Sequence, residues 1–446
     1  MNTRKETILK NFRKNETFLN TTVKNNIEIH RKGTAKLIVT DENGKPIPGA
    51  LVKFCQKSHE FKFGANLFML DELETDEKNK QYKEYFKEIF NLATLPFYWS
   101  DLEPERGKPR YGKESAKIYR RPAPDLCIEY CQENNIEPKL HCLTYDNFIP
   151  TWLLSSSTAE IKKEYTRRFR EIAKRYSETI PTMEVTNELL CGSDKPRSDF
   201  FFADDNAEWS WRTADKFFPF TKLIINEAVL WELPYPTTNR NAYYMQIEQL
   251  LAKNVRIDSI GMQFHSFWLR EQEKELISTR YNPEFVYSVL NKFAQLGRPL
   301  QITEMTIPAF TDIEEDEAIQ AELLNYIYTI FFSHPAMEAI IYWNLPDGYA
   351  AFAPQGDMKA GENYYRGGLL RFDFTKKPAF HVLDELINKR WHAEGKTGTD
   401  DGGNADFHGF YGKYDVTVVT NGKEIKTEID LRKGSQNSFT LQIGKE

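Results

Sequence analysis

The sequence lacks the features that mark membrane, metal-binding or nucleic-acid-binding proteins. No apolar run reaches the roughly 20 residues that a membrane-spanning helix needs. The five cysteines are scattered, without a Cys-x-x-Cys unit, and there is no His-x-His pair, so reduced thiols are expected and neither a metal nor a cofactor is predicted. The formal net charge of -6 gives no attraction to nucleic acid or to an anionic membrane, and we expect neither as a partner.

A secretory signal is also not visible. Residues 1–15 are polar and rich in lysine, without the apolar segment of a signal peptide. Two locations agree with this pattern: the cytoplasm, or the outside of the cell after removal of a signal. The sequence therefore leaves the localisation unknown.

Aromatic residues, by contrast, are plentiful. They make up 14% of the 446 residues, within an overall composition that is normal for a globular protein. Most are expected to fill a core, and some to stack against flat apolar faces such as those of sugar rings. The length suits one large domain with appendages, or two to three smaller ones.

The central part of the chain alternates short apolar runs with longer amphipathic segments. The runs lie at residues 61–67, 89–94, 138–143, 183–187, 222–225, 257–264, 300–303 and 339–343. The clearest helical patterns lie at 159–176, 243–253, 283–296 and 315–332. Eight such units predict an α/β fold, a (β/α)8 (TIM) barrel with enlarged loops. A doubly wound open sheet is the alternative, disfavoured because no Gly-rich phosphate turn follows the first strand.

The two ends of the chain predict a smaller β structure. Strand-like runs at 34–40 and 50–55 flank a turn and indicate a hairpin, and the runs at 414–420 and 424–431 flank Asn421-Gly422, a strong hairpin turn. We expect the two ends to pair into one β-sandwich. The expected organisation is an N-terminal arm or short helix (1–30), a hairpin (31–58), the barrel (59–393), a linker (394–404) and C-terminal strands (405–446).

Glu188 and Glu304 each end one of the central apolar runs. In a barrel, functional side chains gather where the strands end, so the two carboxylates are expected to meet in one cleft. Paired carboxylates are what a glycosidase needs, one to protonate a leaving oxygen and the other to attack the anomeric carbon. Other strand-end candidates are His141, Asn187, Asn226, Glu227, Gln263, His265 and Trp343.

The segments around these residues form a series with a family resemblance. They are residues 186–188, 258–265, 302–305, 141–145 with 150–152, 223–227 and 377–379. Their order resembles glycoside hydrolase family 10, the xylanase family. The resemblance covers about residues 59–390, and both flanking β pieces look like those of certain longer members. It implies a retaining O-glycosyl hydrolase that is similar to an endo-1,4-β-xylanase and acts on a polysaccharide or oligosaccharide.

The resemblance also implies roles for individual residues. Glu188 would be the general acid and then the general base, Glu304 the nucleophile kept ionised by hydrogen bonds, and His265 the group that orients Glu304. Asn187 would bond the sugar 2-hydroxyl, and Trp343 would stack below the ring. The remaining residues expected to contact substrate are His141, Gln263, Tyr145 and Trp99. Glu184, four residues before the acid, is expected to be structural support.

One stretch departs from the family pattern. Members that cut xylan usually carry Glu-Asn and then Lys-Trp after the second strand, where they hold the sugars on the non-reducing side. Here residues 90–104 lack the Glu-Asn pair, and Tyr145 stands where a tryptophan is usual. A site built to bond hydroxyl groups discriminates strongly, so this loss predicts an atypical member.

Other functions remain open at this point. The first is a retaining β-glycosidase that acts on another or a decorated glycan, and the second is a carbohydrate-binding barrel without catalysis. The third is a metal-dependent hydrolase that uses His141 and His265 with a carboxylate. The sequence gives neither the oligomeric state nor endo or exo action.

Overall fold

The computed structural model describes residues 3–443, and most of them form a closed barrel of eight parallel strands, in the order β10-β3-β4-β5-β6-β7-β8-β9. The strands are β3 (Lys62–Asn66), β4 (Leu92–Pro96), β5 (Glu137–His141), β6 (Thr182–Asn187), β7 (Lys222–Glu227), β8 (Ser259–His265), β9 (Leu300–Thr306) and β10 (Met337–Tyr342). Each predicted apolar run overlaps one of them. The predicted barrel is confirmed, and because β10 pairs with β3 the open sheet is wrong.

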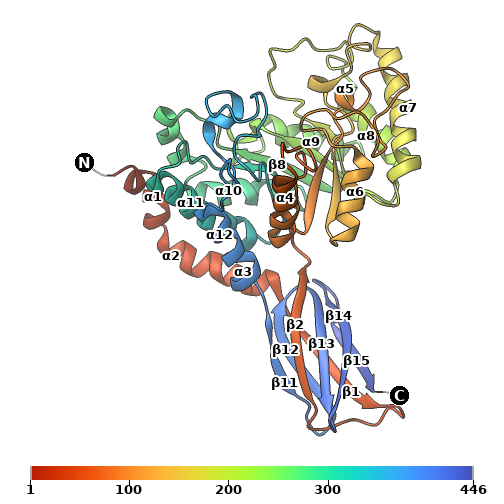
Figure 1. The fold of residues 1–446 in the computed structure, drawn as a ribbon, viewed down its shortest axis with the longest axis vertical. Coiled ribbons are helices and arrows are strands. Elements are labelled where there is room, and N and C mark those ends of the chain that lie inside the picture. Colours follow the sequence, from red (N-terminus) through yellow and green to blue (C-terminus); the bar gives the residue numbers. More distant parts are fainter. Residues whose placement is uncertain (1–2, 444–446) are drawn as a thin grey trace.

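Helices connect the strands and cover the outside of the barrel (Figure 1). They are α4 (Asp76–Ile89), the short α5 (Trp99–Leu102), α6 (Pro124–Glu133), α7 (Thr158–Tyr176), α8 (Asn206–Phe217), α9 (Ala242–Ala252), α10 (Pro283–Ala294), α11 (Glu314–Ser333) and α12 (Pro378–Asp384). In α7 the residues Ile161, Tyr165 and Ile172 lie on one face and are buried, while Ser157 caps its first turn. Among residues 3–443, no helix is long and apolar enough to span a membrane.

The N-terminal segment is more ordered than the arm or short helix expected from the sequence. It forms α1 (Arg4–Lys14), α2 (Glu16–Phe18), a π-helical turn (Leu19–Val23) and α3 (Lys24–Arg31). Ile8, Leu9 and Phe12 are buried against the barrel, and Arg4 forms ion pairs with Glu273 and Asp316. These few apolar residues are separated by many lysines and asparagines, which hides the helical pattern in the sequence.

The two ends of the chain build a β-sandwich, as predicted. One sheet has the order β12-β1-β15 and the other β11-β2-β13-β14. The strands are β1 (Lys32–Asp41), β2 (Leu51–His59), β11 (Glu394–Gly398), β12 (Asn404–Phe410), β13 (Gly412–Thr420), β14 (Lys423–Leu431) and β15 (Ser438–Ile443). The rings of Phe54 and Phe407 stack between the sheets, with centroids 4.0 Å apart.

Two details of this sandwich differ from the sequence-based expectation. The predicted hairpin at 31–58 is wrong, because β1 and β2 lie in different sheets and the turn between them carries the chain from one sheet to the other. The predicted linker 394–404 contains β11, which pairs with β2. The hairpin at Asn421-Gly422 is confirmed: both residues have positive φ, and β13 pairs with β14 directly on either side of them.

The sandwich lies at the end of the barrel where the strands begin (Figure 1). β2 leads into β3 after only residues 60–61. Tyr411 and Lys433 of the sandwich border the same cavity as Lys62 and Thr182 at the starts of β3 and β6. The carboxyl ends of the strands therefore lie at the opposite end of the barrel from the sandwich.

Candidate active site

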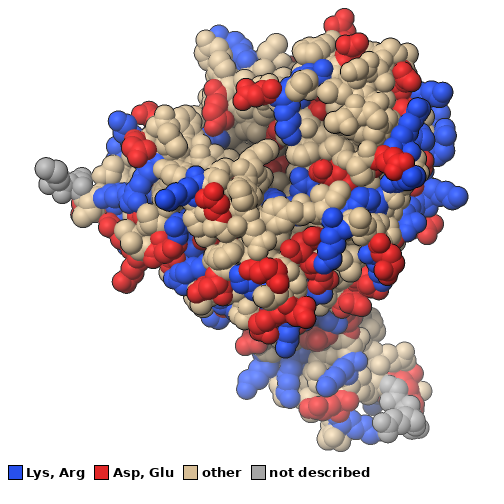
Figure 2. Space-filling model, turned by 45° about the horizontal axis from the view of Figure 1, so that its top comes forward, with Lys and Arg blue, Asp and Glu red and all other residues tan. Residues whose placement is uncertain are grey.

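A cleft of about 820 Å³ opens at the carboxyl ends of the barrel strands. Figure 2 shows the surface hollowed between two raised parts, with acidic and basic side chains near the rim. Nine residues were assigned catalytic or substrate-binding roles from the sequence, and eight of them line the cleft: His141, Tyr145, Asn187, Glu188, Gln263, His265, Glu304 and Trp343. Five barrel strands, β5, β6, β8, β9 and β10, thus bring side chains to one place, as the barrel topology requires.

Glu188 is the first residue after β6 and has a φ of 54°, in the left-handed region that non-glycine residues rarely adopt. Its backbone N–H donates to the carbonyl oxygen of Asn226, at 3.1 Å, which ties this turn to β7. The carboxylate accepts hydrogen bonds from the hydroxyl of Tyr145 and from Nε2 of Gln263, the latter at 3.0 Å. These bonds aim the carboxylate into the cleft.

Glu304 lies on β9 and is held by two donors, one from β8 and one from β7 beyond it. Nδ2 of Asn226 lies 3.0 Å from its Oε1, and Nε2 of His265 lies 3.1 Å from its Oε2. Burial lowers the pKa of His265 to about 4, so the ring is neutral near pH 7. Thr306 Oγ1 lies 3.0 Å from Nδ1 of His265, and a hydroxyl that donates there leaves the proton on Nε2, facing Glu304.

The electrostatics of Glu304 differ from the expectation of a simply ionised carboxylate. Burial raises its pKa, and the carboxylates of Glu184 and Glu188 raise it further, while His141 opposes this effect. The raised pKa favours the protonated form of Glu304, whereas the hydrogen bonds from Asn226 and His265 favour its ionised form.

Behind the cleft, Glu184 forms a buried ion pair with Lys139 and a 2.5 Å hydrogen bond with Nδ1 of His141. Burial alone would raise the pKa of Glu184, but Lys139 and His141 lower it to about 2. Glu184 in turn raises the pKa of His141 against the effect of burial. His141 is thereby fixed, with its Nε2 3.0 Å from the hydroxyl of Tyr98.

The cluster of His141, Glu184 and Glu304 also bears on a metal-dependent mechanism. Ligand atoms of His141, Glu184 and Glu304 lie within 4.8 Å of one another, a spacing that a metal ion could bridge. The ammonium group of Lys139, however, already pairs with Glu184, and a second cation beside it would be repelled. The arrangement fits a buried ion-pair network better than a metal centre.

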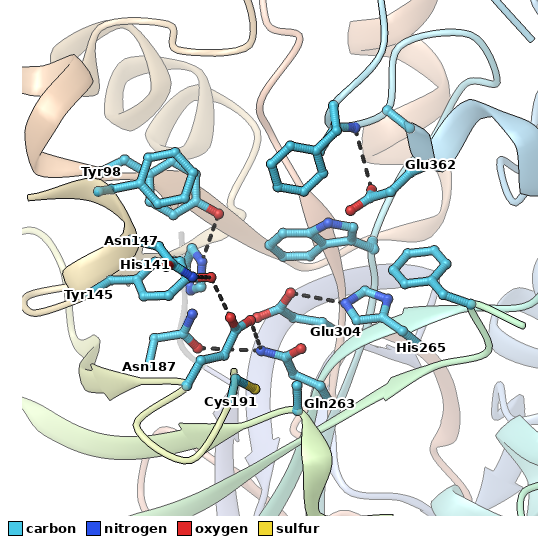
Figure 3. A pocket seen from close by; sticks show the side chains of 18 of the residues that line it. Tyr98, His141, Tyr145, Asn147, Asn187, Cys191, Gln263, His265, Glu304 and Glu362 are labelled. Atoms are coloured by element: carbon cyan, nitrogen blue, oxygen red, sulfur yellow. Dashed lines mark hydrogen bonds and ion pairs between the residues drawn. The ribbon is translucent and has the colours of Figure 1, made fainter. Parts of the chain in front are cut away.

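Asn187 and Trp343 complete the base of the cleft. Oδ1 of Asn187 accepts from Nδ2 of Asn226 at 2.8 Å. The same oxygen lies 3.4 Å from Nε2 of Gln263 in the cleft (Figure 3). The Trp343 ring is nearly perpendicular to the rings of His141 and His265, at interplanar angles of 77° and 75°. Two flanking rings thus fix the indole in one orientation.

Trp99 is the one of these nine residues that does not line the cleft. It begins the short helix α5 and is buried, with its Nε1 donating to Glu103 at 2.8 Å and its ring beside Tyr165. Its neighbour Tyr98 faces the cleft instead and stacks on Phe148, with centroids 4.1 Å apart. The turn from β4 into α5 directs the two side chains to opposite sides.

Asn226 and Glu227 support different parts of the site. Asn226 contacts Glu304 and Asn187, as described above. Glu227 accepts hydrogen bonds from the backbone of Leu190, at 2.9 Å, and from the thiol of Cys191, at 3.0 Å. It thereby fixes the loop that follows Glu188.

Several lining residues were not among the sequence-based candidates. They are Phe68, Tyr98, Arg120, Arg121, Phe148 and Glu362. Tyr98 is the second residue after β4, and a position close to a strand end is a signal for a site residue. The arginines lie within a long irregular loop, where the sequence offers no periodic pattern, and Glu362 lies in a short 3-10 helix (Gly361–Tyr365). The loops that begin at Cys191 and Ala350 both border the cleft.

Comparison with known proteins gives a family match. The model of glycosyl hydrolase family 10 matches residues 56–384. Among curated proteins, anti-sigma-I factor RsgI6 of Acetivibrio thermocellus is 23% identical over 419 residues, covering 91% of this chain and 47% of that protein. Endo-1,4-beta-xylanase 2 of Arabidopsis thaliana is 23% identical over 418 residues, covering 92% and 34%. The chain thus spans half or less of the length of these relatives.

Solved structures show the same barrel. Xylanase 10B from Thermotoga petrophila RKU-1, solved in complex with xylobiose, aligns with a TM-score of 0.58 at 22% sequence identity. The alignment covers 74% of this chain and 95% of that one. At this identity the likeness establishes the fold, and the chemistry has to be argued from the residues in the cleft.

Proposed function

The chain belongs to glycosyl hydrolase family 10, and from this premise we propose that it cleaves a β-linked glycan of the xylan type with net retention of anomeric configuration. One observation carries the proposal. Glu188 and Glu304, at the ends of β6 and β9, face one cleft and are joined by hydrogen bonds through Gln263, Asn187 and Asn226.

The first step forms a covalent glycosyl-enzyme. A carboxylate oxygen of Glu304 attacks the anomeric carbon while Glu188 donates its proton to the glycosidic oxygen, and the bond between that carbon and the leaving group breaks. His265 and Asn226 donate to Glu304 and hold it in place for the attack. A hydrogen bond from the Asn187 side chain to the sugar 2-hydroxyl would strengthen as positive charge develops on the ring.

The second step releases the sugar. Glu188, now ionised, takes a proton from a water molecule, whose oxygen attacks the anomeric carbon and displaces Glu304. The hydrogen bonds from Tyr145 and Gln263 stabilise the negative charge on Glu188 during this interval. Two inversions give net retention.

A xylan-type substrate is supported by the xylanases among the similar proteins. The second candidate, another or a decorated β-linked glycan, is favoured by the part of the cleft near β4. Tyr98, Phe148 and Arg121 line this part of the cleft, which therefore presents aromatic rings and a guanidinium group to the substrate. A carbohydrate-binding barrel without catalysis is disfavoured because both carboxylates and His265 are in place.

Two variants with an activated aryl β-xylobioside test the mechanism. Glu304→Ala should lose turnover, and added azide should restore part of it with an inverted glycosyl azide as product. Glu188→Ala should form the glycosyl-enzyme but release it slowly, and azide should then yield the retained product. Wild-type rates in both variants would refute the assignment. Hydrolysis of xylan compared with mannan and glucan then tests the substrate.

A further inference from the structure

Two consecutive arginines line the cleft on the side of β3, β4 and β10. Arg120 is only 5% exposed, and its Nη1 donates to the carbonyl oxygen of Tyr349 and lies 3.4 Å from Oδ1 of Asn344. Both partners are neutral. Within residues 3–443, no carboxylate lies at ion-pair distance from the guanidinium of Arg120.

A buried guanidinium without a counter-ion is unfavourable, because its hydration is lost and no opposite charge replaces it. Burial and the adjacent charge of Arg121 lower the pKa of Arg120, but an arginine still keeps its proton near neutrality. Glu362, on the far side of the cleft from Tyr98 (Figure 3), acts on Arg120 only from a distance. The cleft therefore has positive charge next to Arg120 that the protein itself does not neutralise.

Arg121 presents a second guanidinium group beside the first. Its Nε donates to Oδ2 of Asp101 at 2.7 Å, and its charged group lies 4.2 Å from the ring centroid of Tyr98. Asp101 balances the charge of Arg121 and fixes its position. The uncompensated charge is thus that of Arg120, while Arg121 adds oriented donors.

The position of the pair relative to the proposed reaction follows from the topology. Glu188, directly after β6, would protonate the leaving group, so the leaving group lies toward β6 and β7. Arg120 lies 5.6 Å from the ring centroid of Phe68, which packs against Trp343 on the other side of the cleft's centre. The arginines therefore face the sugars on the glycone side of the scissile bond.

We propose that Arg120 and Arg121 recognise an oxyanion on the glycone side of the substrate, in the form of a uronic acid carboxylate. A guanidinium binds a carboxylate through two parallel N–H donors, and a sulfate ester offers the same geometry. This proposal rests on the proposed hydrolase function and narrows its substrate to an acidic, decorated glycan. The bound oxyanion supplies the counter-ion that Arg120 lacks.

Matched substrates test the proposal. One is a xylo-oligosaccharide with a single glucuronic acid branch, and the other is the same compound after reduction of the carboxyl group to an alcohol. We expect kcat/KM to be at least tenfold higher for the acidic compound, and Arg120→Gln to abolish this preference. The exposed Arg212→Gln on α8 serves as the control and should keep it. Equal kcat/KM for the two compounds with the wild-type protein would overturn the proposal.

Further measurements separate the possible causes of a failure. Arg120→Lys keeps the positive charge but loses the two parallel N–H donors of the guanidinium group. This variant should lose most of the preference for the acidic compound, while its thermal unfolding stays near that of the wild type.

Titration calorimetry of Glu304→Gln with both compounds measures recognition without cleavage. Tighter binding of the acidic compound supports recognition of an oxyanion by Arg120 and Arg121, even if the aryl xylobioside is not cleaved. Failure to cleave the aryl xylobioside would refute only the hydrolase function. Equal binding of the two compounds overturns the recognition proposal. A sulfated xylo-oligosaccharide bound as tightly as the acidic one would show that the pair recognises oxyanions in general.

Discussion

Nδ2 of Asn226, on β7, lies 3.0 Å from Oε1 of Glu304, on β9, across the intervening strand β8. The same nitrogen lies 2.8 Å from Oδ1 of Asn187, which neighbours Glu188. Asn226 is itself fixed, because its Oδ1 accepts a 2.5 Å hydrogen bond from the hydroxyl of Thr303. One amide group thus links the residues on both sides of the proposed reaction centre.

Asn226→Ala should slow the reaction and shift its pH dependence. A hydrogen bond to a charged group contributes about 1.5–3 kcal/mol, so kcat/KM should fall roughly 10- to 100-fold. Burial and the nearby carboxylates already raise the pKa of Glu304, and loss of a donor to the ionised form raises it further. Because the proposed nucleophile must be ionised, the acidic limb of the kcat/KM profile should move to higher pH.

The control for this prediction is Thr303→Val, which leaves the amide of Asn226 in place but loosens it. It should produce a smaller loss of kcat/KM with the acidic limb almost unmoved. An unchanged acidic limb in Asn226→Ala would mean that this amide does not act on the ionisation of Glu304.

The barrel and its two glutamates could be predicted from the sequence because both depend on regular patterns. Strands such as β6 and β9 are continuous apolar runs, and the residue that ends a run falls at the carboxyl edge of the barrel. Trp99 was misplaced because it follows the end of β4, where a difference of one residue reverses the side to which a side chain points. Arg120 and Arg121 belong to a long irregular loop, and only the folded chain brings them to the cleft.

The stability of the protein should decrease as the pH falls below about 6.5. Burial lowers the pKa of His59, His265 and His334 to about 4, whereas histidine in an unfolded chain titrates near 6.5. Between these values the unfolded state binds more protons than the folded state, so the free energy of unfolding rises with pH. The stabilisation is full above about pH 6.5 and is lost progressively toward pH 4. Urea denaturation at a series of pH values measures it.

His59→Gln isolates one contribution to this dependence. His59 lies far from the cleft, with Nε2 3.3 Å from the carbonyl oxygen of Ile387. Its removal should reduce the loss of stability between pH 7 and pH 4 by about 3 kcal/mol. The exposed His408→Gln should leave the dependence unchanged. If both variants show the wild-type slope, burial of His59 does not control its titration.

Lys139→Met should destabilise the protein by about 3–5 kcal/mol, because it leaves the carboxylate of Glu184 buried without its ammonium partner. Both side chains are fully buried. The double variant Lys139→Met/Glu184→Gln removes the stranded charge and should recover part of the loss, as measured by chemical denaturation. A double variant less stable than the single one would argue that Lys139 acts through packing and not through charge.

Tyr98→Phe and Trp99→Phe form a matched pair that tests how the chain leaves β4. The Tyr98 hydroxyl lies in the cleft, 3.0 Å from Nε2 of His141, so its removal should change kcat or KM with little effect on unfolding. The indole of Trp99 donates to Glu103, which Arg167 also binds, so Trp99→Phe should cost about 1–3 kcal/mol of stability. Its KM should stay at the wild-type value. The opposite result, with Trp99→Phe raising KM and Tyr98→Phe lowering stability, would mean that the side chains point the other way and that Trp99 is the residue that contacts the glycone.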